Sequence, residues 1–310
     1  MISQAYDTPP YIQKILIAED IRDKPHISHN DVAGLNFIRN QAAYVFRKYY
    51  KQGLRSQILE VLDASAVLRQ NKGEIINGIR HFPRANPVKI LRIFRTKFKS
   101  LEGIFEEIEK YRIIEKYLPP DSYSKSCEFI VDYIREGKYD FILCGFQDYV
   151  EGKVLNPWDL IQPNLLSNLV NSMQDEGRNP LKMTTAQLIQ RVQKQASHFI
   201  ERLKKMILEA NYVPDLAGVG NLIFTPAGDL KLVDINNISR VCFGSDISLD
   251  DRGYPVCDKS IEAISIMEQK LLGRTINMAE TLYKVFLAPQ RMQDVKRLEK
   301  NFQHSLKLRL

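Results

Sequence analysis

Three polar residues with the chemistry of a magnesium site lie close together between Tyr212 and Ser239. Asp215 comes first, Asn221 follows it by six positions, and Asp234 ends a short apolar run. Carboxylate and carboxamide oxygens are ligands that Mg²⁺ accepts in proteins. A second carboxylate beside such an ion can orient or deprotonate an attacking hydroxyl. These residue types therefore predict oxygen ligation of Mg²⁺, with one carboxylate left for acid–base chemistry.

The local pattern indicates which elements would bring these side chains together. A long helix is predicted from Thr184 or Thr185, with apolar residues at helical spacing as far as residue 207. Gly218 and Gly220 allow a tight loop after this helix. Two apolar runs separated by turn residues then predict a hairpin over residues 222–235. Such a hairpin would reverse the chain and bring both carboxylates and the carboxamide to one common site.

The remaining chain is predicted to contain short strands upstream of this segment and mainly helices around it. An amphipathic helix is predicted over residues 31–51. Strands are then predicted within residues 58–68, 74–82 and 88–95, followed by a helix over 100–118 and strands over 127–133 and 141–146. Loosely amphipathic residues predict a further helix over 157–173, and helices again from residue 260.

In this order and spacing the motifs resemble those of the protein-kinase-like superfamily, and its aminoglycoside phosphotransferase and lipopolysaccharide kinase branch more than typical protein kinases. The resemblance covers about residues 57–275. It implies an α+β, two-lobed fold with a small lobe of antiparallel sheet plus one helix and a mainly helical large lobe. The implied organisation is an N-terminal helical extension (1–56), a small nucleotide-binding lobe (57–150) and a large catalytic lobe (151–310).

The resemblance also implies roles for the three polar residues. Asp215 takes the position of the catalytic base, and Asn221 that of a metal ligand on the same loop. Asp234 takes the position of the magnesium-binding aspartate, in an Asp-Ile-Asn context where protein kinases have Asp-Phe-Gly. Asp258, at the start of a later helix, would brace the catalytic loop. ATP and Mg²⁺ are the cofactors that follow from these positions.

Nucleotide binding is expected from residues of the small lobe. Arg92 or Lys89 would bind the phosphates from the third strand, and Glu107 on the following helix would steady that basic side chain. The two basic residues lie three positions apart and therefore on opposite faces of a strand.

The segment that follows the last predicted strand resembles the hinge to which adenine binds through backbone groups. The residues at these positions are Gln147, Tyr149 and Val150.

The chain departs from the family pattern at several points. The step from Asp215 to Asn221 is one residue longer than usual, and Pro214 stands where a basic residue is common. The segment Asn71-Lys72-Gly73 offers a single glycine for a phosphate loop, and Arg92 is not a simple substitute for lysine. These departures keep open the alternative of a pseudokinase, a binding or scaffolding module that retains the fold with little or no catalysis.

Composition limits the other classes of function. The net charge of +7 is dispersed along the chain, so nucleic acid is not expected as a partner. No apolar run approaches the roughly 20 residues of a membrane span. The four cysteines are spaced singly, which predicts buried free thiols and a cytoplasmic location. The expected activity is an ATP- and Mg²⁺-dependent phosphotransferase acting on a hydroxyl of a small-molecule, lipid-linked or protein acceptor, and nucleotidyl transfer on the same fold remains an alternative.

Overall fold

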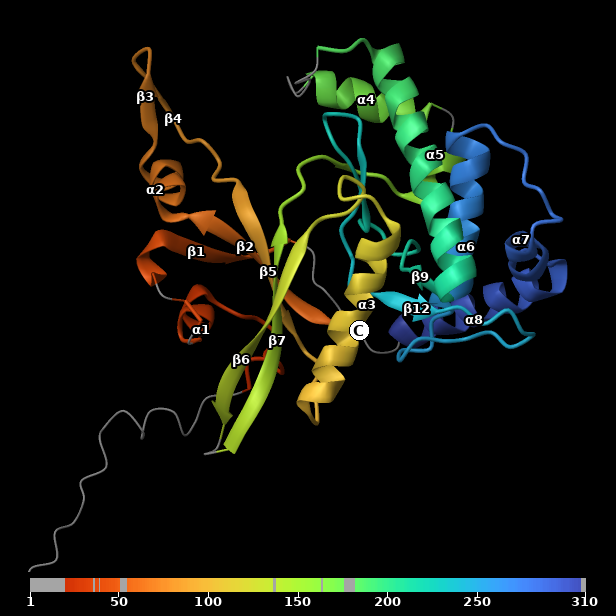
Figure 1. Ribbon diagram of the computed structural model, residues 1–310. Helices are drawn as coiled ribbons and strands as arrows, with labels where there is room; N and C mark the ends of the chain where they lie inside the picture. The colour runs from red at the N-terminus through yellow and green to blue at the C-terminus, as the bar shows by residue number, and fades with distance from the viewer. Residues whose placement is uncertain are drawn as a thin grey trace, which may run out of the picture. The chain divides into compact units, whose positions relative to one another are not determined.

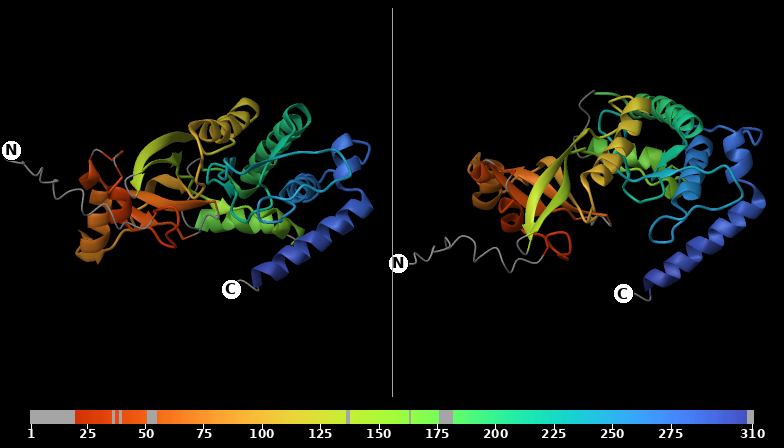
Figure 2. Two further views of the ribbon diagram at one scale, coloured as in Figure 1. Left: turned by 90° about the horizontal axis from the view of Figure 1, so that it is seen from below. Right: turned by 60° about the horizontal axis from the view of Figure 1, so that its bottom comes forward.

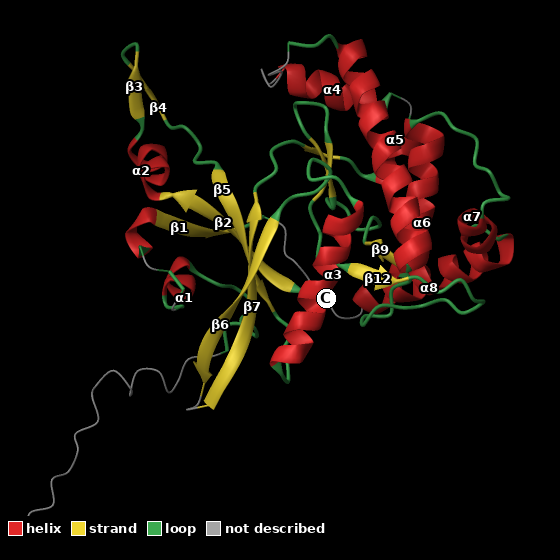
Figure 3. Ribbon diagram, viewed as in Figure 1, coloured by secondary structure: helices red, strands yellow, loops and turns green. Residues whose placement is uncertain are grey.

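The computed structural model describes residues 20–35, 37–38, 40–50, 55–135, 138–162, 164–175 and 182–307 (Figure 1). Within them the chain is an α+β protein with a five-stranded antiparallel sheet and eight α-helices. Contacts divide it into two compact units. The sheet unit is Met1–Glu106 with Lys125–Tyr149, and the helical unit is Glu107–Ser124 with Val150–Leu310. Strands dominate the first unit and helices the second (Figure 3).

The sheet unit is built on five strands in the spatial order β1-β2-β5-β7-β6. Every neighbouring pair is antiparallel. The strands are β1 (Tyr44–Lys48), β2 (Ser56–Asp63), β5 (Pro87–Phe94), β6 (Ser126–Arg135) and β7 (Lys138–Asp148). The strands predicted over 88–95, 127–133 and 141–146 are thereby confirmed as β5, β6 and β7.

The two faces of this sheet differ in polarity, because successive side chains of a strand point to opposite sides. Leu91 and Ile93 of β5 are buried in a core with residues of the N-terminal segment such as Ile21 and Val32. Arg92 lies between them in sequence and therefore faces the other side of the sheet. The apolar face is thus covered by the N-terminal residues of the same unit, while the opposite face carries charge.

The prediction of a helix over residues 31–51 is wrong. The described residues of this segment form a short helix α1 (His29–Ala33), a 3₁₀ turn η1 (Gln41–Ala43) and the strand β1. Gly34 caps the end of α1. Tyr44, Val45 and Phe46 are aromatic or β-branched and pair with β2, so sheet formation outweighs the helical spacing of the apolar residues. Residues 1–19 of the predicted N-terminal extension lie outside the described residues.

An excursion separates β2 from β5. It consists of α2 (Ala64–Lys72) and a hairpin of β3 (Glu74–Ile76) and β4 (Ile79–His81). The strand predicted over 58–68 ends at Asp63, because the Asp63 side chain accepts the Ala66 N–H and caps α2. The run 74–82 contains both strands of the hairpin, which extends away from the sheet (Figure 1).

The helical unit surrounds short strands with helices. Its helices are α3 (Leu101–Tyr117, from Glu107 onward), η2 (Pro157–Ile161), α4 (Leu165–Asp175), α5 (Thr185–Ala210), α6 (Val256–Ile266), the π-helix η3 (Met267–Leu271), α7 (Thr281–Phe286) and α8 (Pro289–Lys307). Its strands are β8 (Lys153–Val154), β9 (Tyr212–Pro214), β10 (Leu222–Phe224), β11 (Leu230–Leu232) and β12 (Ile238–Arg240). Figure 2 shows α8 at the edge of the unit.

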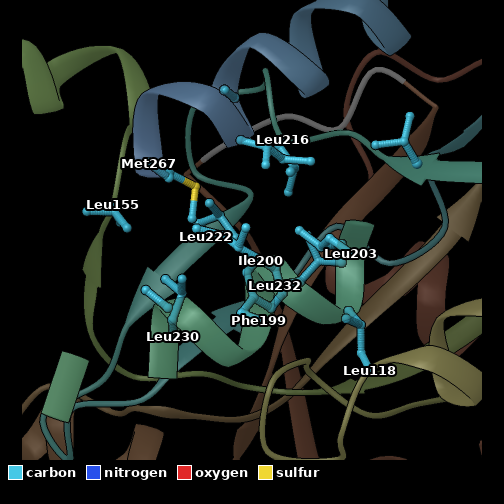
Figure 4. Packing of buried hydrophobic residues seen from close by; sticks show 14 of the residues in the cluster. Leu118, Leu155, Phe199, Ile200, Leu203, Leu216, Leu222, Leu230, Leu232 and Met267 are labelled. Carbon is cyan, nitrogen blue, oxygen red and sulfur yellow. The ribbon is translucent and has the colours of Figure 1, made fainter. Parts of the chain in front are cut away.

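The core of the helical unit lies between α5 and the β10–β11 hairpin. Phe199, Ile200 and Leu203 of α5 are fully buried and pack with Leu222 and Leu232 of the hairpin (Figure 4). Thr184 caps α5 through a capping box with Gln187, which confirms the start predicted from the sequence. The core therefore holds the hairpin that carries the candidate metal ligands against the longest helix.

Other sequence expectations are confirmed or revised in detail. The predicted helix over 100–118 is α3, whereas the one over 157–173 is two shorter helices, η2 and α4. All four cysteines are free, but Cys127 and Cys242 are exposed, so the expectation of buried thiols holds only for Cys144 and Cys257. No helix within the described ranges is long and apolar enough to cross a bilayer.

We expect Gly152→Ala to destabilise the protein. A Cβ at Gly152 would lie 2.2 Å from the carbonyl oxygen of Phe224 and 2.7 Å from Ile223 Cγ2, against the backbone of β10. Overpacking of this kind costs about 1–3 kcal/mol or more. The matched control is Gly103→Ala in the first turn of α3, where the nearest atom is 3.7 Å away. That change should be neutral or stabilise by up to about 1 kcal/mol. Equal urea midpoints for the two variants would contradict the prediction.

Candidate functional site

Asp215 follows β9 and is held by the segment that contains β12. The backbone N–H of Asp215 donates to the Asn237 carbonyl at 2.8 Å, next to the antiparallel pairing of β9 with β12. The Asn237 side chain donates back, from Nδ2 to Asp215 Oδ2 at 2.9 Å. Asp215 is only 7% exposed. Backbone and side chain thus fix this carboxylate to the residue that immediately precedes β12.

The loop itself supplies further donors to the Asp215 carboxylate. Its Oδ1 accepts the backbone N–H groups of Ala217 at 2.9 Å and of Gly218 at 3.0 Å. An aspartate that binds the backbone two and three residues ahead forms a local turn. The turn directs two N–H dipoles at the carboxylate, so the loop is organised around this side chain.

Two residues outside the loop hold its backbone in place. The N–H of Leu216 donates to Ser260 Oγ in α6 at 3.1 Å. Trp158 Nε1 in η2 donates to the Ala217 carbonyl at 3.0 Å. The Leu216 side chain is fully buried and points into the core (Figure 4). The loop is therefore anchored by apolar packing and by polar contacts to two different helices.

Asn221 is tied to the same loop by its amide. Its Nδ2 donates to the Asp215 carbonyl at 2.8 Å, which leaves the carboxamide oxygen available as a ligand. A Cβ at Gly218 would lie 2.6 Å from that Nδ2, so only glycine leaves room for this arrangement. The turn closes through the Asn221 N–H, which donates to the Gly218 carbonyl at 3.3 Å. This turn accommodates the extra residue between Asp215 and Asn221.

The hairpin brings Asp234 to the Asn221 end of the loop. Leu222 of β10 pairs with Leu232 of β11, and beyond this pair the Val233 N–H donates to the Asn221 carbonyl at 2.8 Å. Asp234 is the next residue and is half-buried. Asp215, Asn221 and Asp234 are therefore brought together, as the sequence pattern predicts.

The electrostatic environment raises the pKa of Asp215 to about 6 from its ordinary value of 3.8. Burial is the largest cause, and the neighbouring charge of Asp234 is the second. The N–H groups of Gly218 and Ala217 and the guanidinium of Arg252 act in the opposite direction. The two carboxylates thus repel each other, and a cation bound between them would reduce this repulsion.

The donor set fits a magnesium ion only if the substrate completes it. Among the described residues no group of three or more His, Cys, Asp or Glu side chains could hold a metal. Asn221 and Asp234 offer one carboxamide oxygen and one carboxylate. Mg²⁺ is commonly bound by one or two carboxylates together with phosphate oxygens and water rather than by a complete protein cage. The residues present fit that mode of binding.

The sheet unit carries a second group of predicted site residues, centred on Arg92. The side chains of Arg92 and Glu128 are both buried, and Arg92 Nη2 lies 3.7 Å from Glu128 Oε1. They flank Gly145, which is the register partner of both residues. A Cβ at Gly145 would lie 3.2 Å from Glu128 Oε1 and from Ser126 Oγ. Glycine in β7 therefore leaves space above the sheet for a buried ion pair, which sequence reasoning missed.

Lys89 and the hinge residues lie at one end of the same sheet. Lys89 forms an ion pair with Asp148 at the end of β7, and both side chains are about half exposed. Gln147 is buried in β7 beside Ile90. Tyr149 ends the second segment of the sheet unit, and Val150 begins the second segment of the helical unit. The predicted hinge therefore coincides with one of the three points at which the chain passes from one unit to the other.

The predicted pairing of Glu107 with the basic residue of β5 stays a prediction. In the helical unit Glu107 Oε2 binds Lys110 Nζ at 2.7 Å, one turn further along α3. Arg92 belongs to the sheet unit, where Glu128 is its carboxylate neighbour. The glycine considered for phosphate binding, Gly73, caps α2 in the excursion outside the five-stranded sheet.

Asp258 was expected to brace the Asp215 loop, but its carboxylate contacts a different segment. Its carboxylate binds Arg291 of α8, with Arg291 Nε 2.5 Å from Asp258 Oδ1. Arg291 in turn donates to the carbonyls of Gly244 and Asp246. Asp258 therefore fixes the segment after β12, and Ser260, two residues along, contacts the Asp215 loop.

Comparison with known proteins adds no family assignment: no protein-family model matches the chain, and no curated protein matches it significantly in sequence. The class defined by the structure is an α+β protein with a five-stranded antiparallel sheet.

The buried Asp215 predicts a distinctive dependence of stability on pH. Because its folded pKa of about 6 lies above the unfolded value of 3.8, the folded state binds more protons between these values. Stability should therefore fall as pH rises from about 4 to about 6. Asp215→Asn removes this effect. Relative to that variant, the native chain should lose up to about 3 kcal/mol between pH 4 and 7 in urea unfolding.

Asp250→Asn is the matched control, because Asp250 should change the stability with pH in the opposite direction to Asp215. Although burial disfavours its charge, hydrogen bonds from Tyr254 and Arg252 hold the pKa of Asp250 below its ordinary value. The stability that Asp250 contributes is present above the unfolded pKa and is lost as pH falls below it. The control should therefore lose stability at neutral pH and match the native chain in acid. Parallel pH profiles for the two variants would rule out the environment described for Asp215.

Proposed function

We propose that the chain is an ATP- and Mg²⁺-dependent phosphotransferase of the two-lobed, protein-kinase-like class, acting on a hydroxyl of a small-molecule, lipid-linked or protein acceptor. The observation that carries the proposal is the loop from Asp215 to Asn221. It holds a buried carboxylate on two backbone N–H groups and fixes a carboxamide to the same residue. A hairpin brings Asp234 beside them. This combination is the one that the resemblance to kinases predicts.

Asp215 would orient the acceptor hydroxyl and accept its proton. Among the described residues Oδ2 accepts a hydrogen bond from Asn237, and a carboxylate oxygen with one donor retains an acceptor site for a hydroxyl. A pKa near 6 leaves the carboxylate ionised at neutral pH and closer to neutrality than an ordinary aspartate, as suits a general base. Mg²⁺, when bound by Asn221 and Asp234, would supply positive charge to the phosphates. Catalysis of this kind depends mainly on positioning and on charge stabilisation.

The charged face of the sheet supports nucleotide binding. Arg92 lies on the face opposite the apolar core, in the third strand of the sheet along the chain. Its guanidinium can bind phosphate oxygens in a bidentate manner. The Glu128 carboxylate near it would orient the guanidinium, a role that the resemblance assigns to Glu107. Gln147, Tyr149 and Val150 provide the hinge segment for the adenine.

A pseudokinase is the second candidate, and one observation favours it. Arg92 already has a buried carboxylate within 3.7 Å, so its charge is partly neutralised before any phosphate binds. The chain would then keep the fold and the nucleotide without efficient transfer. The two candidates differ in ATP turnover, which the phosphotransferase requires and the binding or scaffolding module does not.

We expect MgATP to stabilise the native chain against thermal unfolding. A ligand at about 100 times its dissociation constant adds roughly 2.7 kcal/mol. The resulting shift in melting temperature should require Mg²⁺. It should disappear in Asp234→Ala, because that variant lacks the carboxylate ligand. The matched control is Asp229→Ala, which removes a carboxylate from the turn of the same hairpin, where it binds Arg191.

Each outcome of this measurement separates the candidates. A Mg²⁺-dependent shift retained in Asp229→Ala, with ADP release that Asp215→Asn abolishes, supports the phosphotransferase. The same shift without ADP release, in the presence or absence of candidate acceptors, supports the pseudokinase. Absence of any shift in the native chain would contradict the phosphotransferase and would leave a kinase-shaped binding or scaffolding module as the better account.

Gly218→Ala tests the support of Asn221 without altering a polar group. The added Cβ would displace the Asn221 carboxamide, since its Nδ2 lies only 2.6 Å from the Cβ position. Loss of support for a metal ligand costs about 10–100-fold in metal affinity or activity. We therefore expect a loss of this size in the Mg²⁺ dependence of the MgATP shift, measured by titration. Gly244→Ala, where no atom lies within 4 Å, should leave the titration unchanged.

A further inference from the structure

The tip of the β3–β4 hairpin exposes three isoleucines. Ile75 is 65% exposed, Ile76 47% and Ile79 64%. They flank a two-residue turn in which Asn77 and Gly78 both have positive φ, 51° and 78°. Positive φ at both positions defines the type I′ turn that matches the twist of a β-hairpin. The hairpin is therefore a well-formed element that ends in apolar side chains, and such exposure in a group generally marks an interaction site.

The isoleucines lie on both faces of the hairpin. Ile76 pairs with Ile79 across the ladder, so these two side chains share one face. Ile75 pairs with Arg80 on the other face, which Phe82, 61% exposed, extends. A flat protein surface would cover one face of such a hairpin and leave the other in water. Immersion of the tip in an apolar layer would cover both faces at once.

Basic residues lie behind the apolar tip. Between residues 69 and 84 the chain has four basic residues, Arg69, Lys72, Arg80 and Arg84, and one acidic residue, Glu74. Arg69, Lys72, Arg80 and Arg84 are all exposed. A basic group set back from an apolar tip complements an interface with anionic headgroups outside and acyl chains within.

The base of the hairpin is fixed on the end of α2. The Gly73 N–H donates to the Arg69 carbonyl at 2.8 Å, and Arg80 Nη1 donates to the Lys72 carbonyl at 2.7 Å. Gly73 has φ 71°, and a Cβ there would lie 2.8 Å from the His81 carbonyl. The tip is thus pre-organised, so little conformational entropy would be lost when it inserts.

We propose that the β3–β4 tip inserts into the interface of an anionic lipid bilayer, with Ile75, Ile76 and Ile79 in the acyl region and the basic residues at the phosphate headgroups. The inference rests on the excursion in the sheet unit alone and does not depend on phosphotransfer. It assigns to the protein a peripheral membrane contact.

The test is co-flotation of the full chain with vesicles. One set is phosphatidylcholine alone, and the other contains phosphatidylglycerol at about one lipid in three. The hairpin variant is Ile75→Asn/Ile76→Asn/Ile79→Asn. The matched control changes three exposed apolar residues of the helical unit, Leu208→Asn/Leu249→Asn/Met278→Asn, which are 54%, 46% and 48% exposed. A basic variant is Arg69→Gln/Lys72→Gln, which leaves the hydrogen bond of the Arg80 side chain in place.

The native chain and the matched control should bind the anionic vesicles and not the neutral ones. The hairpin variant should lose binding at least about tenfold, because the free energy of insertion scales with buried apolar area. Each basic residue removed should weaken binding about fivefold, and raising the salt should weaken it further.

Several results would overturn the inference. These are a native chain that stays off anionic vesicles, equal binding to both vesicle types, or a hairpin variant that binds as the native chain does. The native chain could instead fail to bind vesicles but self-associate in light scattering, with the association lost in the hairpin variant. That result would show that the tip contacts a second copy of the chain. If the triple variant fails to fold by circular dichroism, Ile75→Asn and Ile79→Asn singly serve the same comparison.

Discussion

The candidate site depends on the hydrogen bonding of a single residue, Asp215. Its N–H donates to the Asn237 carbonyl, its own carbonyl accepts the Asn221 amide, and both carboxylate oxygens accept donors from Ala217, Gly218 and Asn237. Loop, hairpin and following strand therefore meet at one side chain. Any change that moves Asp215 changes the placement of Asn221 as well, so the positions of the proposed base and of one proposed metal ligand are coupled.

The same arrangement costs stability. A carboxylate that is buried and close to Asp234 is harder to ionise, and the raised pKa of Asp215 expresses that cost as differential stability between protonation states. A buried carboxylate of this kind commonly makes a protein less stable than a variant in which the residue is replaced. Apolar packing offsets the cost, since Leu216 beside it is fully buried and Phe199 and Leu232 belong to the same core. The unit tolerates an unfavourable carboxylate because its neighbours in sequence are bound to a large apolar cluster.

The sequence predicted the parts of the structure that follow from local pattern. The β10–β11 hairpin and α5 carry clear alternation, helical spacing and capping residues, so Asp215 and Asn221 could be placed on the loop between them and Asp234 at the end of the hairpin. Ser260, Trp158 and Glu128 act through contacts distant in the chain, and no local pattern marks them. The segment around β1 was wrongly predicted as a helix because its apolar spacing suits a helix as well, and only the pairing with β2 decides between the two. Gly145 carried the one available signal, a glycine inside a strand, which indicates close approach by another group.

The course of the chain has a consequence for any attempt to divide the protein. Residues 107–124 belong to the helical unit although they precede two strands of the sheet unit. Within the helical unit the Leu232 N–H donates to the Ser122 carbonyl and its carbonyl accepts the Ser124 N–H, at 2.9 and 2.8 Å. A fragment that begins at Val150 would contain β11 without the residues 122–124 that hydrogen-bond to Leu232. A fragment that ends at Tyr149 would contain residues 107–124 without β11. The two units are interleaved in the sequence, so neither corresponds to one uninterrupted segment of the chain.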